Sequence, residues 1–251
     1  MFLIPGKVGF CKSAFLFIFV RMSKDLLKYD FGAGVEAFST EREAKLPYYV
    51  VQPHQVHGVE IREVREPMTT REELEGVDAL VTNVPGVAIS VRTADCIPVL
   101  LYDPVHRAVA AVHAGWRGTV QRISQKVICR MRELYGTDAA DVVAVIGPGI
   151  GPESFQVGQE VADAFAAAGF PMAEILQDCG PKAPTADNPM NGGLHIDLWR
   201  ANRWLLEQSG VKSIQIAGIC TYQNNDRFFS ARREGTKCGR IINCIKLSGA
   251  N

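Results

Sequence analysis

The chain contains two kinds of hydrophobic pattern, which predict different secondary structure. In residues 118–136, 158–170 and 195–210, apolar residues return every three or four positions, which is typical of amphipathic helices. Elsewhere, short β-branched runs bounded by Gly, Pro, Asn or Asp predict strands. The predicted strands are Tyr48–Gln52, Val59–Val64, Ala79–Thr82, Val87–Val91, Val99–Tyr102, Ala108–His113, Val142–Ile146, Ser213–Ala217 and Ile241–Lys246. Because strands gather early and helices come later, we expect an α+β fold with more than one sheet.

Two turn-rich stretches separate these elements. Residues 178–194 are rich in proline, glycine and asparagine, and we expect them to form an ordered surface loop. The glycines of IGPGIGPESFQVG, residues 146–158, follow a predicted strand, but no Lys-Ser or Lys-Thr pair ends the motif and no G-x-G-x-x-G opens a helix. We therefore interpret them as tight turns with special backbone angles rather than as a phosphate loop.

The composition favours small-molecule chemistry. The 251 residues are 47% hydrophobic and 22% charged, which is ordinary for a soluble globular protein. Lys+Arg and Asp+Glu total 27 each, so the net charge is zero, which argues against a nucleic acid or an anionic membrane as the main partner. No repeat or linker divides residues 22–251, and we expect them to form a single domain. A homodimer of this domain is compatible with the sequence.

The N-terminus and the cysteines bear on where the protein acts. The apolar run at residues 14–20 is too short to span a bilayer, and we expect residues 1–21 to be an extension outside the fold. The seven cysteines show no paired framework and no C-x-x-C motif, so we interpret them as reduced thiols of a cytoplasmic protein.

Three side chains of metal-binding type fall at ends of predicted strands. His54 and His57 are three residues apart in extended chain, so they point to opposite faces, and we take His57, beside Gly58, as the inward one. Cys96 opens an apolar strand and His113 closes another. Taken singly, an inert buried thiol and a core histidine are the ordinary interpretations. If the strands are neighbours, however, the three side chains form a three-ligand zinc site with one open position, where bound water is activated.

Six motifs, in this order, resemble the YfiH-type laccase-domain family, also called the multicopper polyphenol oxidoreductase family. They are QVHG, TADCIPVLL, AAVHAGWRGT, GPGIGPESFQVGQEV, HIDLWRANRWLL and FFSARREGTKCGRI, and the resemblance runs from about Val35 to Lys246. It implies a four-layer α/β/β/α sandwich with the metal ligands His57, Cys96 and His113. It also implies a zinc-dependent purine nucleoside phosphorylase that takes adenosine, inosine, guanosine and methylthioadenosine, with an added adenosine deaminase activity.

Phosphorolysis needs groups that hold phosphate and move protons. One arginine can bind two phosphate oxygens at once through its paired N–H groups. The candidates for phosphate binding are Arg42, Arg232 and Arg233. Asp95 is a candidate proton shuttle, with a turn-stabilising role as the alternative. The sequence departs from the family near Arg42, because no glycine pair follows it and the segment before QVHG is short. This departure bears on the substrate pocket.

Three other functions stay open. The family's older name suggests a copper-dependent polyphenol oxidase. The five histidines contain no His-x-His pair and cannot supply the clustered ligands of a multicopper oxidase, although a single Cu²⁺ would fit the same site as zinc. Cys96 with His113 would also suit a metal-free thiol hydrolase. Lastly, the shortened segment leaves room for a nucleoside-binding protein without catalytic activity.

Overall fold

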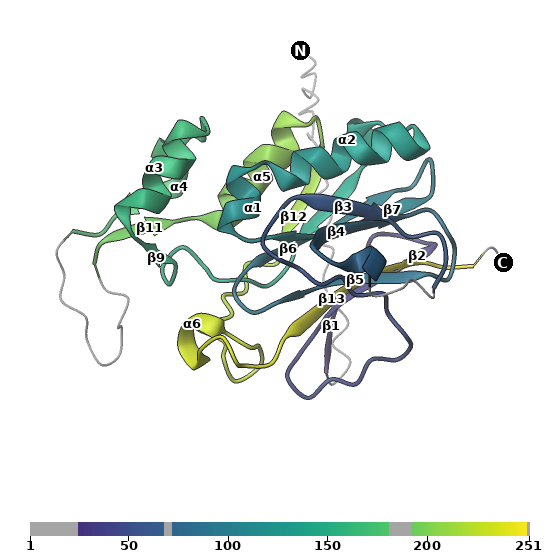
Figure 1. The fold of residues 1–251 in the computed structure, drawn as a ribbon, viewed down its shortest axis with the longest axis horizontal. Helices are drawn as coiled ribbons and strands as arrows, with labels where there is room; N and C mark the ends of the chain where they lie inside the picture. Colours follow the sequence, from purple (N-terminus) through teal and green to yellow (C-terminus); the bar gives the residue numbers. More distant parts are fainter. Residues whose placement is uncertain (1–24, 68–71, 181–191, 250–251) are drawn as a thin grey trace, which may run out of the picture.

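The computed structural model describes residues 25–67, 72–180 and 192–249, so the expectation for residues 1–21 lies outside the described residues. Its main sheet is mixed and has six strands in the order β12-β8-β6-β7-β4-β3 (Figure 1). The strands are β3 (Glu60–Glu63), β4 (Val77–Thr82), β6 (Ile97–Asp103), β7 (Ala108–Ala114), β8 (Val143–Ile146) and β12 (Ser213–Ile216). Every residue of β6 and β7 is buried, which agrees with the apolar character of these strands at every position except Asp103 and His113.

A second sheet is antiparallel and joins the two ends of the described chain. Its order is β1-β2-β13-β5. The strands are β1 (Leu26–Tyr29), β2 (Val35–Thr40), β5 (Ala88–Thr93) and β13 (Ile241–Leu247). Since the last strand lies between β2 and β5, the early and late parts of the sequence form one hydrophobic unit.

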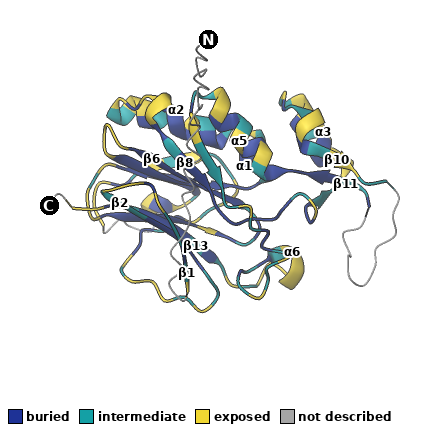
Figure 2. Cartoon of the chain, turned by 180° about the vertical axis from the view of Figure 1, so that it is seen from behind, coloured by how far each residue is buried: buried dark blue, intermediate teal, exposed yellow. Residues whose placement is uncertain are grey.

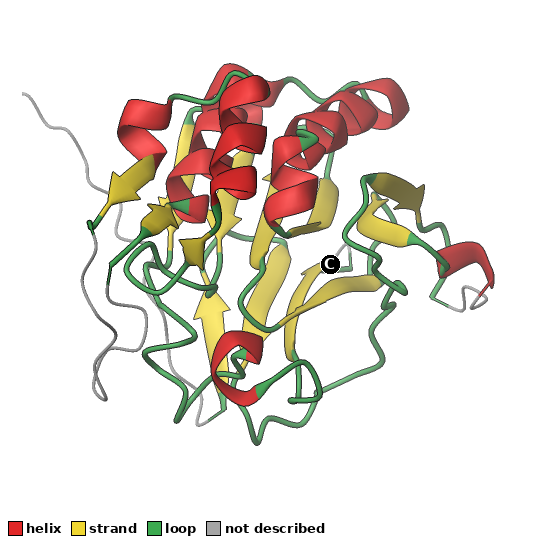
Figure 3. Cartoon of the chain, turned by 60° about the vertical axis from the view of Figure 1, so that its left-hand side comes forward, coloured by secondary structure: helices red, strands yellow, loops and turns green. Residues whose placement is uncertain are grey.

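The two sheets are stacked, and helices cover the outer face of the larger one (Figures 2 and 3). One apolar cluster lies between the sheets and includes Leu100, Ala111 and Ile89. A second cluster lies between the six-stranded sheet and the helices. The helices that pack there are α1 (Trp116–Val120), α2 (Ile123–Tyr135) and α5 (Leu198–Gln208).

The predicted α+β class, with one domain and more than one sheet, is confirmed. On the outer face of the four-stranded sheet, Tyr48 and Val50 pack against Phe38 and Cys244. Within the described residues, this face is therefore covered by an irregular segment and not by a helix. It is the segment that the sequence shows to be short before the QVHG motif.

A small three-stranded sheet and two helices form the remaining part (Figure 1). Its elements are β9 (Gln156–Val157), α3 (Gln159–Ala167), α4 (Met172–Ile175), β10 (Leu176–Asp178) and β11 (Leu194–Ile196). The remaining short helices are α6 (Ala231–Glu234) and the 3-10 turns Glu72–Leu74 and Ala139–Asp141. The expected loop 178–194 is described only at its two ends, where Asp178 closes β10 and Leu194 opens β11.

Three predictions of secondary structure were wrong in detail, and some strands were not predicted. Tyr48–Gln52 is not a strand: only Val51 makes a bridge, to Ile89 of β5. The predicted helix 118–136 is split, because Arg122 adopts a left-handed conformation (φ 64°) between α1 and α2. The helix expected from residue 195 begins at Leu198, since residues 194–196 pair in a sheet. The strands β1 and β2 were not predicted, because their polar residues interrupt the apolar pattern.

None of the helices in the described part of the chain is long and apolar enough to cross a membrane.

The glycine-rich run 147–151 lies against the residues that carry Cys96. The Ile150 N–H donates to the Asp95 carbonyl (2.8 Å). A Cβ on Gly149 would lie 2.5 Å from Ile97 Cδ1 and 3.0 Å from the Asp95 carbonyl oxygen. The glycine is therefore needed for close packing of two backbones.

We expect Gly149→Ala to lower the free energy of unfolding by about 1–3 kcal/mol, because the added methyl overpacks a buried contact. Urea unfolding measures the change. Gly249→Ala is the control, since a Cβ there has no neighbour within 4 Å and should leave stability unchanged. Equal stability of the two variants would contradict the packing argument.

Candidate metal centre

Strand pairing brings the three candidate ligands to one edge of the six-stranded sheet. Cys96 directly precedes β6 and His113 lies near the end of β7, and these strands are antiparallel with Pro98 opposite His113. β4 is antiparallel to β7 and parallel to β3, so the start of β3 lies at the same edge. His57 stands in the loop that leads into β3. The sheet thus gathers side chains that are far apart in the sequence.

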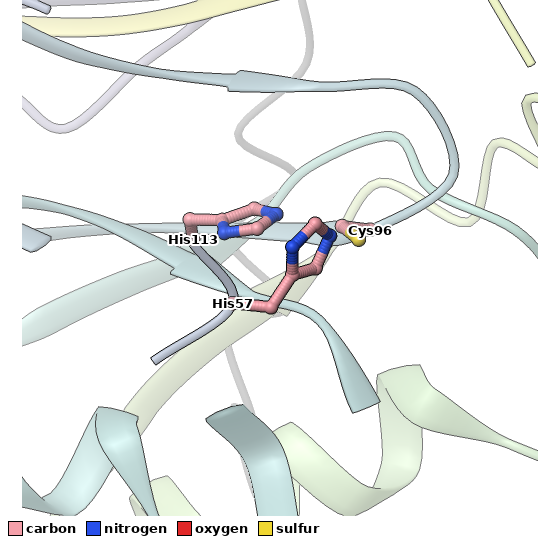
Figure 4. Close-up of side chains that lie close together, drawn as sticks. All are labelled: His57, Cys96 and His113. Atoms are coloured by element: carbon pink, nitrogen blue, oxygen red, sulfur yellow. The ribbon is translucent and has the colours of Figure 1, made fainter. Parts of the chain in front are cut away.

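The three side chains are close enough to share one ion. Their ligand atoms all lie within 4.8 Å of one another. The His57 and His113 rings are 4.9 Å apart between centroids, inclined at 69°, and Figure 4 shows the Cys96 sulfur beside them. His113 is buried, Cys96 is half-buried and His57 is exposed, so the group opens to solvent on one side.

Gly115 makes room for this group. A Cβ at this position would lie 3.0 Å from Cys96 Sγ and 3.2 Å from His57 Cδ2. A larger residue after Ala114 would push two of the three ligands apart. A glycine thus follows the strand of His113 because a side chain at this position would crowd the ligand cluster.

A buried carboxylate, Asp78 of β4, positions two of the ligands. Its Oδ1 lies 2.7 Å from His113 Nδ1, which leaves His113 Nε2 as the ring nitrogen available for an ion. The same carboxylate accepts the backbone N–H groups of Val56, His57 and Gly58 at 3.2, 3.0 and 2.7 Å. These bonds hold the loop at His57, whose φ of 62° is in the left-handed region. The arrangement is the carboxylate–histidine pair that commonly supports a metal ligand.

Asp78 was not identified from the sequence. The residue stands in the apolar run GVDALVT, and its side chain is fully buried. A charged residue inside a buried strand is rare unless it is paired, and this was the signal that could have found it.

The electrostatics of the cluster favour a thiolate. Burial raises the pKa of Cys96, but His113 and His57 outweigh it and lower the pKa to about 6. Burial lowers the pKa of His113, but Cys96 and Asp78 raise it to about 9. Burial also raises the pKa of Asp78, while His113 and the N–H of Gly58 hold it below its usual range. Cys96 can therefore bind a cation as a thiolate at neutral pH.

The donor set fits a metal ion. Two imidazoles and one thiolate, with one side open, match a catalytic zinc site, and the same donors also bind copper. The open side faces a cavity of about 300 Å³. Within residues 25–67, 72–180 and 192–249, this is the one group of three such ligands that is found.

Asp95 lies next to Cys96, but its carboxylate is engaged elsewhere. Its Oδ1 accepts the Thr221 hydroxyl (2.7 Å) and its Oδ2 accepts the backbone N–H of Arg232 (2.6 Å). Its φ is 86°, so it forms the turn that leads into Cys96. This geometry favours the turn-stabilising role over that of a proton shuttle.

The three arginines that the sequence suggested for phosphate binding are held by protein groups. Arg42 pairs with Glu234 (2.7 Å), and its Cζ lies 4.5 Å from the centre of the Phe229 ring. Arg232 Nη1 and Arg233 Nη1 each donate to a backbone carbonyl at 3.0 Å. None of the three is among the residues that line the cavity.

The arginines that do line the cavity are Arg92 and Arg240, together with the three ligands. Neither arginine was among the residues proposed from the sequence. The signal for Arg92 was a charged residue in the apolar run AISVRT, where it is the one exposed position of β5.

We expect Asp78→Asn to lower zinc affinity by about 10- to 100-fold, because the loss of the carboxylate loosens both His113 and the His57 loop. Competition with a chromophoric chelator measures the affinity, and circular dichroism checks that the variant is folded. Asp163→Asn, on the exposed face of α3, is the matched control. Unchanged affinity in a folded Asp78→Asn variant would show that the carboxylate does not position the ligands.

Comparison with known proteins places this site in a family. The model of the family described as "Multi-copper polyphenol oxidoreductase laccase" matches residues 36–248. A purine nucleoside phosphorylase of Bacteroides thetaiotaomicron is 43% identical over 215 residues, which cover 82% of this chain and 76% of that protein. The adenosine deaminase RL5 of an unknown prokaryotic organism is 39% identical over 204 residues, 78% of this chain and 74% of that protein.

The fold comparison agrees with the sequence match. The crystal structure of the hypothetical protein YfiH from Bacillus licheniformis aligns with a TM-score of 0.78 over 90% of this chain and 97% of that one, at 24% identity, a likeness of fold. The family match covers most of the chain, including all three candidate ligands and Asp78. The chain therefore belongs to the YfiH-type family of multi-copper polyphenol oxidoreductase laccase proteins.

Proposed function

We propose that the protein is a zinc-dependent purine nucleoside phosphorylase. The observation that carries the proposal is the convergence of His57, Cys96 and His113 on one cavity. The relative from B. thetaiotaomicron, named a purine nucleoside phosphorylase, supports the choice of reaction. The substrates proposed are adenosine, inosine, guanosine and methylthioadenosine, with inorganic phosphate as the second substrate.

The reaction exchanges one bond at the anomeric carbon. A phosphate oxygen forms a bond with C1′ as the C1′–N9 bond breaks. The electron pair of the broken C1′–N9 bond passes to the purine, which takes up a proton. Zinc held by the three ligands would supply a Lewis acid or an acidic water for the charge that develops on the purine. The protein's own part is to fix the ligands through Asp78 and to hold both substrates in the cavity.

We also propose a second activity of the same site. A relative named an adenosine deaminase supports deamination of adenosine as a second activity, in which water replaces the 6-amino group. We also propose a cytoplasmic location, since every cysteine in the described residues is a free thiol. A homodimer is compatible with this function.

One observation favours a second candidate, a metal-free thiol hydrolase. Cys96, His113 and Asp78 form a thiol–imidazole–carboxylate series, in which the pKa of Cys96 is lowered to about 6. The position of His57 near the same sulfur favours metal binding instead, because such a triad does not need a second histidine. Copper-dependent oxidation of phenols is the other alternative and depends on which metal the site holds.

We expect the zinc-loaded protein to convert inosine to hypoxanthine and ribose 1-phosphate only when phosphate is present. Chromatography of the products, with zinc quantified in the same sample, tests this. About one zinc per chain is expected for a three-ligand site. Equally fast release of hypoxanthine without phosphate would replace the phosphorylase with a hydrolase.

We expect Cys96→Ala to lose both zinc and phosphorolysis, because the thiolate is a ligand. The matched control is Cys129→Ala, an exposed cysteine on α2, which should keep both. Loss of activity with zinc retained in Cys96→Ala would favour a nucleophilic thiol over a ligand.

A further inference from the structure

We infer that Arg92 and Arg240 form the binding site for inorganic phosphate in the cavity beside the metal ligands. The inference rests on the proposed phosphorylase function and names the residues that hold its second substrate. Neither arginine was identified from the sequence, where Arg42, Arg232 and Arg233 were the candidates.

Strand register places the two arginines side by side. In the pairing of β5 with β13, Arg92 lies opposite Ile242, and Thr93 lies opposite Ile241. Arg240 directly precedes β13, two residues before Ile242, so it projects to the same face as Ile242 and Arg92. They are therefore diagonal neighbours, a separation that long side chains can bridge.

The backbone around Arg92 is fixed. The side chain of Gln55 accepts the Arg92 N–H and donates to the Arg92 carbonyl, both at 2.8 Å. Gln55 lies two residues before His57, so the same loop carries a metal ligand and holds the strand of Arg92. The spacing between Arg92 and the ligand cluster is thus set by the fold.

Arg240 is held by uncharged groups. Its Nη1 donates to the carbonyls of Cys238 and Gly239, and its Nη2 donates to the carbonyl of Thr236 at 2.9 Å. Carbonyl oxygens orient a guanidinium without cancelling its charge. Arg42 differs in this respect, since the Glu234 carboxylate neutralises it.

The cavity therefore contains two arginine charges that no carboxylate of the described lining residues neutralises. Its lining includes no aspartate or glutamate from the described residues, and in the same ranges no carboxylate pairs with Arg92 or Arg240. The carboxylates of Asp78 and Asp95 lie nearby but bond to His113, Thr221 and the Arg232 N–H. Two like charges on one face repel each other unless an anion lies between them.

Phosphate matches this arrangement. Guanidinium groups bind phosphate oxygens through paired N–H donors, and two of them can hold three oxygens while the fourth is left to react. The bound oxygens lie beside the metal ligands, where the nucleoside must also sit. A phosphate held there would form its bond to C1′ as the purine leaves with the electron pair of the broken bond.

The test compares Arg92→Gln and Arg240→Gln with Arg132→Gln, an exposed arginine on α2, in the zinc-loaded protein. We expect each cavity variant to raise the KM for phosphate by about 10- to 100-fold, the effect of losing one charged hydrogen-bonding partner. The KM for inosine and the zinc content should stay near those of the unaltered protein, and Arg132→Gln should change nothing.

Direct calorimetric titration of inorganic phosphate gives a second measurement that needs no turnover. Binding to the unaltered protein that weakens in Arg92→Gln supports the inference, even if Arg240→Gln fails to fold. Unchanged phosphate KM and binding in folded Arg92→Gln would overturn it, as would tight binding of inosine 5′-monophosphate without binding of free phosphate. If the unaltered protein binds phosphate through these arginines but does not cleave inosine, the phosphorylase proposal fails and the anion site stands.

Discussion

The hydrogen bonds of the Asp78 carboxylate are the interaction on which the site depends. A buried charge is costly unless it is paired and bonded, and here one imidazole and three backbone N–H groups satisfy it. Because the same carboxylate holds the His113 ring and the His57 loop, the two nitrogen ligands are fixed to one strand. Cys96 joins them through the antiparallel pairing of β6 with β7. The ligands are thus positioned by the folded chain itself.

The cavity beside the ligands is lined by residues from both of the stacked sheets. β7 of the larger sheet carries His113, and β5 of the smaller sheet carries Arg92. β13 lies between β2 and β5 in the smaller sheet and brings Arg240 from the C-terminal part of the chain. The three candidate metal ligands and the two arginines therefore lie together where the ends of two sheets meet. This is the combination that a phosphorolytic reaction requires, a place for an anion next to a group that stabilises the leaving purine.

The three candidate metal ligands could be proposed from the sequence because residue type and local context point to them. Histidine at the end of an apolar strand and cysteine before another are uncommon, and the motifs around them resemble one family. Asp78 could not be assigned a partner in this way, because its bond to His113 spans 35 positions and depends on the order of the strands. The split at Arg122 was missed for a related reason, since the apolar periodicity continues across it.

The sequence by itself determined the α+β class, most of the strands and the three residue types that can bind a metal, because these follow from local patterns of polarity and from donor chemistry. Only the tertiary structure decided which charged residues face the cavity. Arg42 is neutralised by Glu234, 192 positions away, whereas Arg92 and Arg240 become neighbours through the register of β5 with β13. The physical reason is that an arginine's role depends on the charge and distance of its partners, and the folded sheets alone set both.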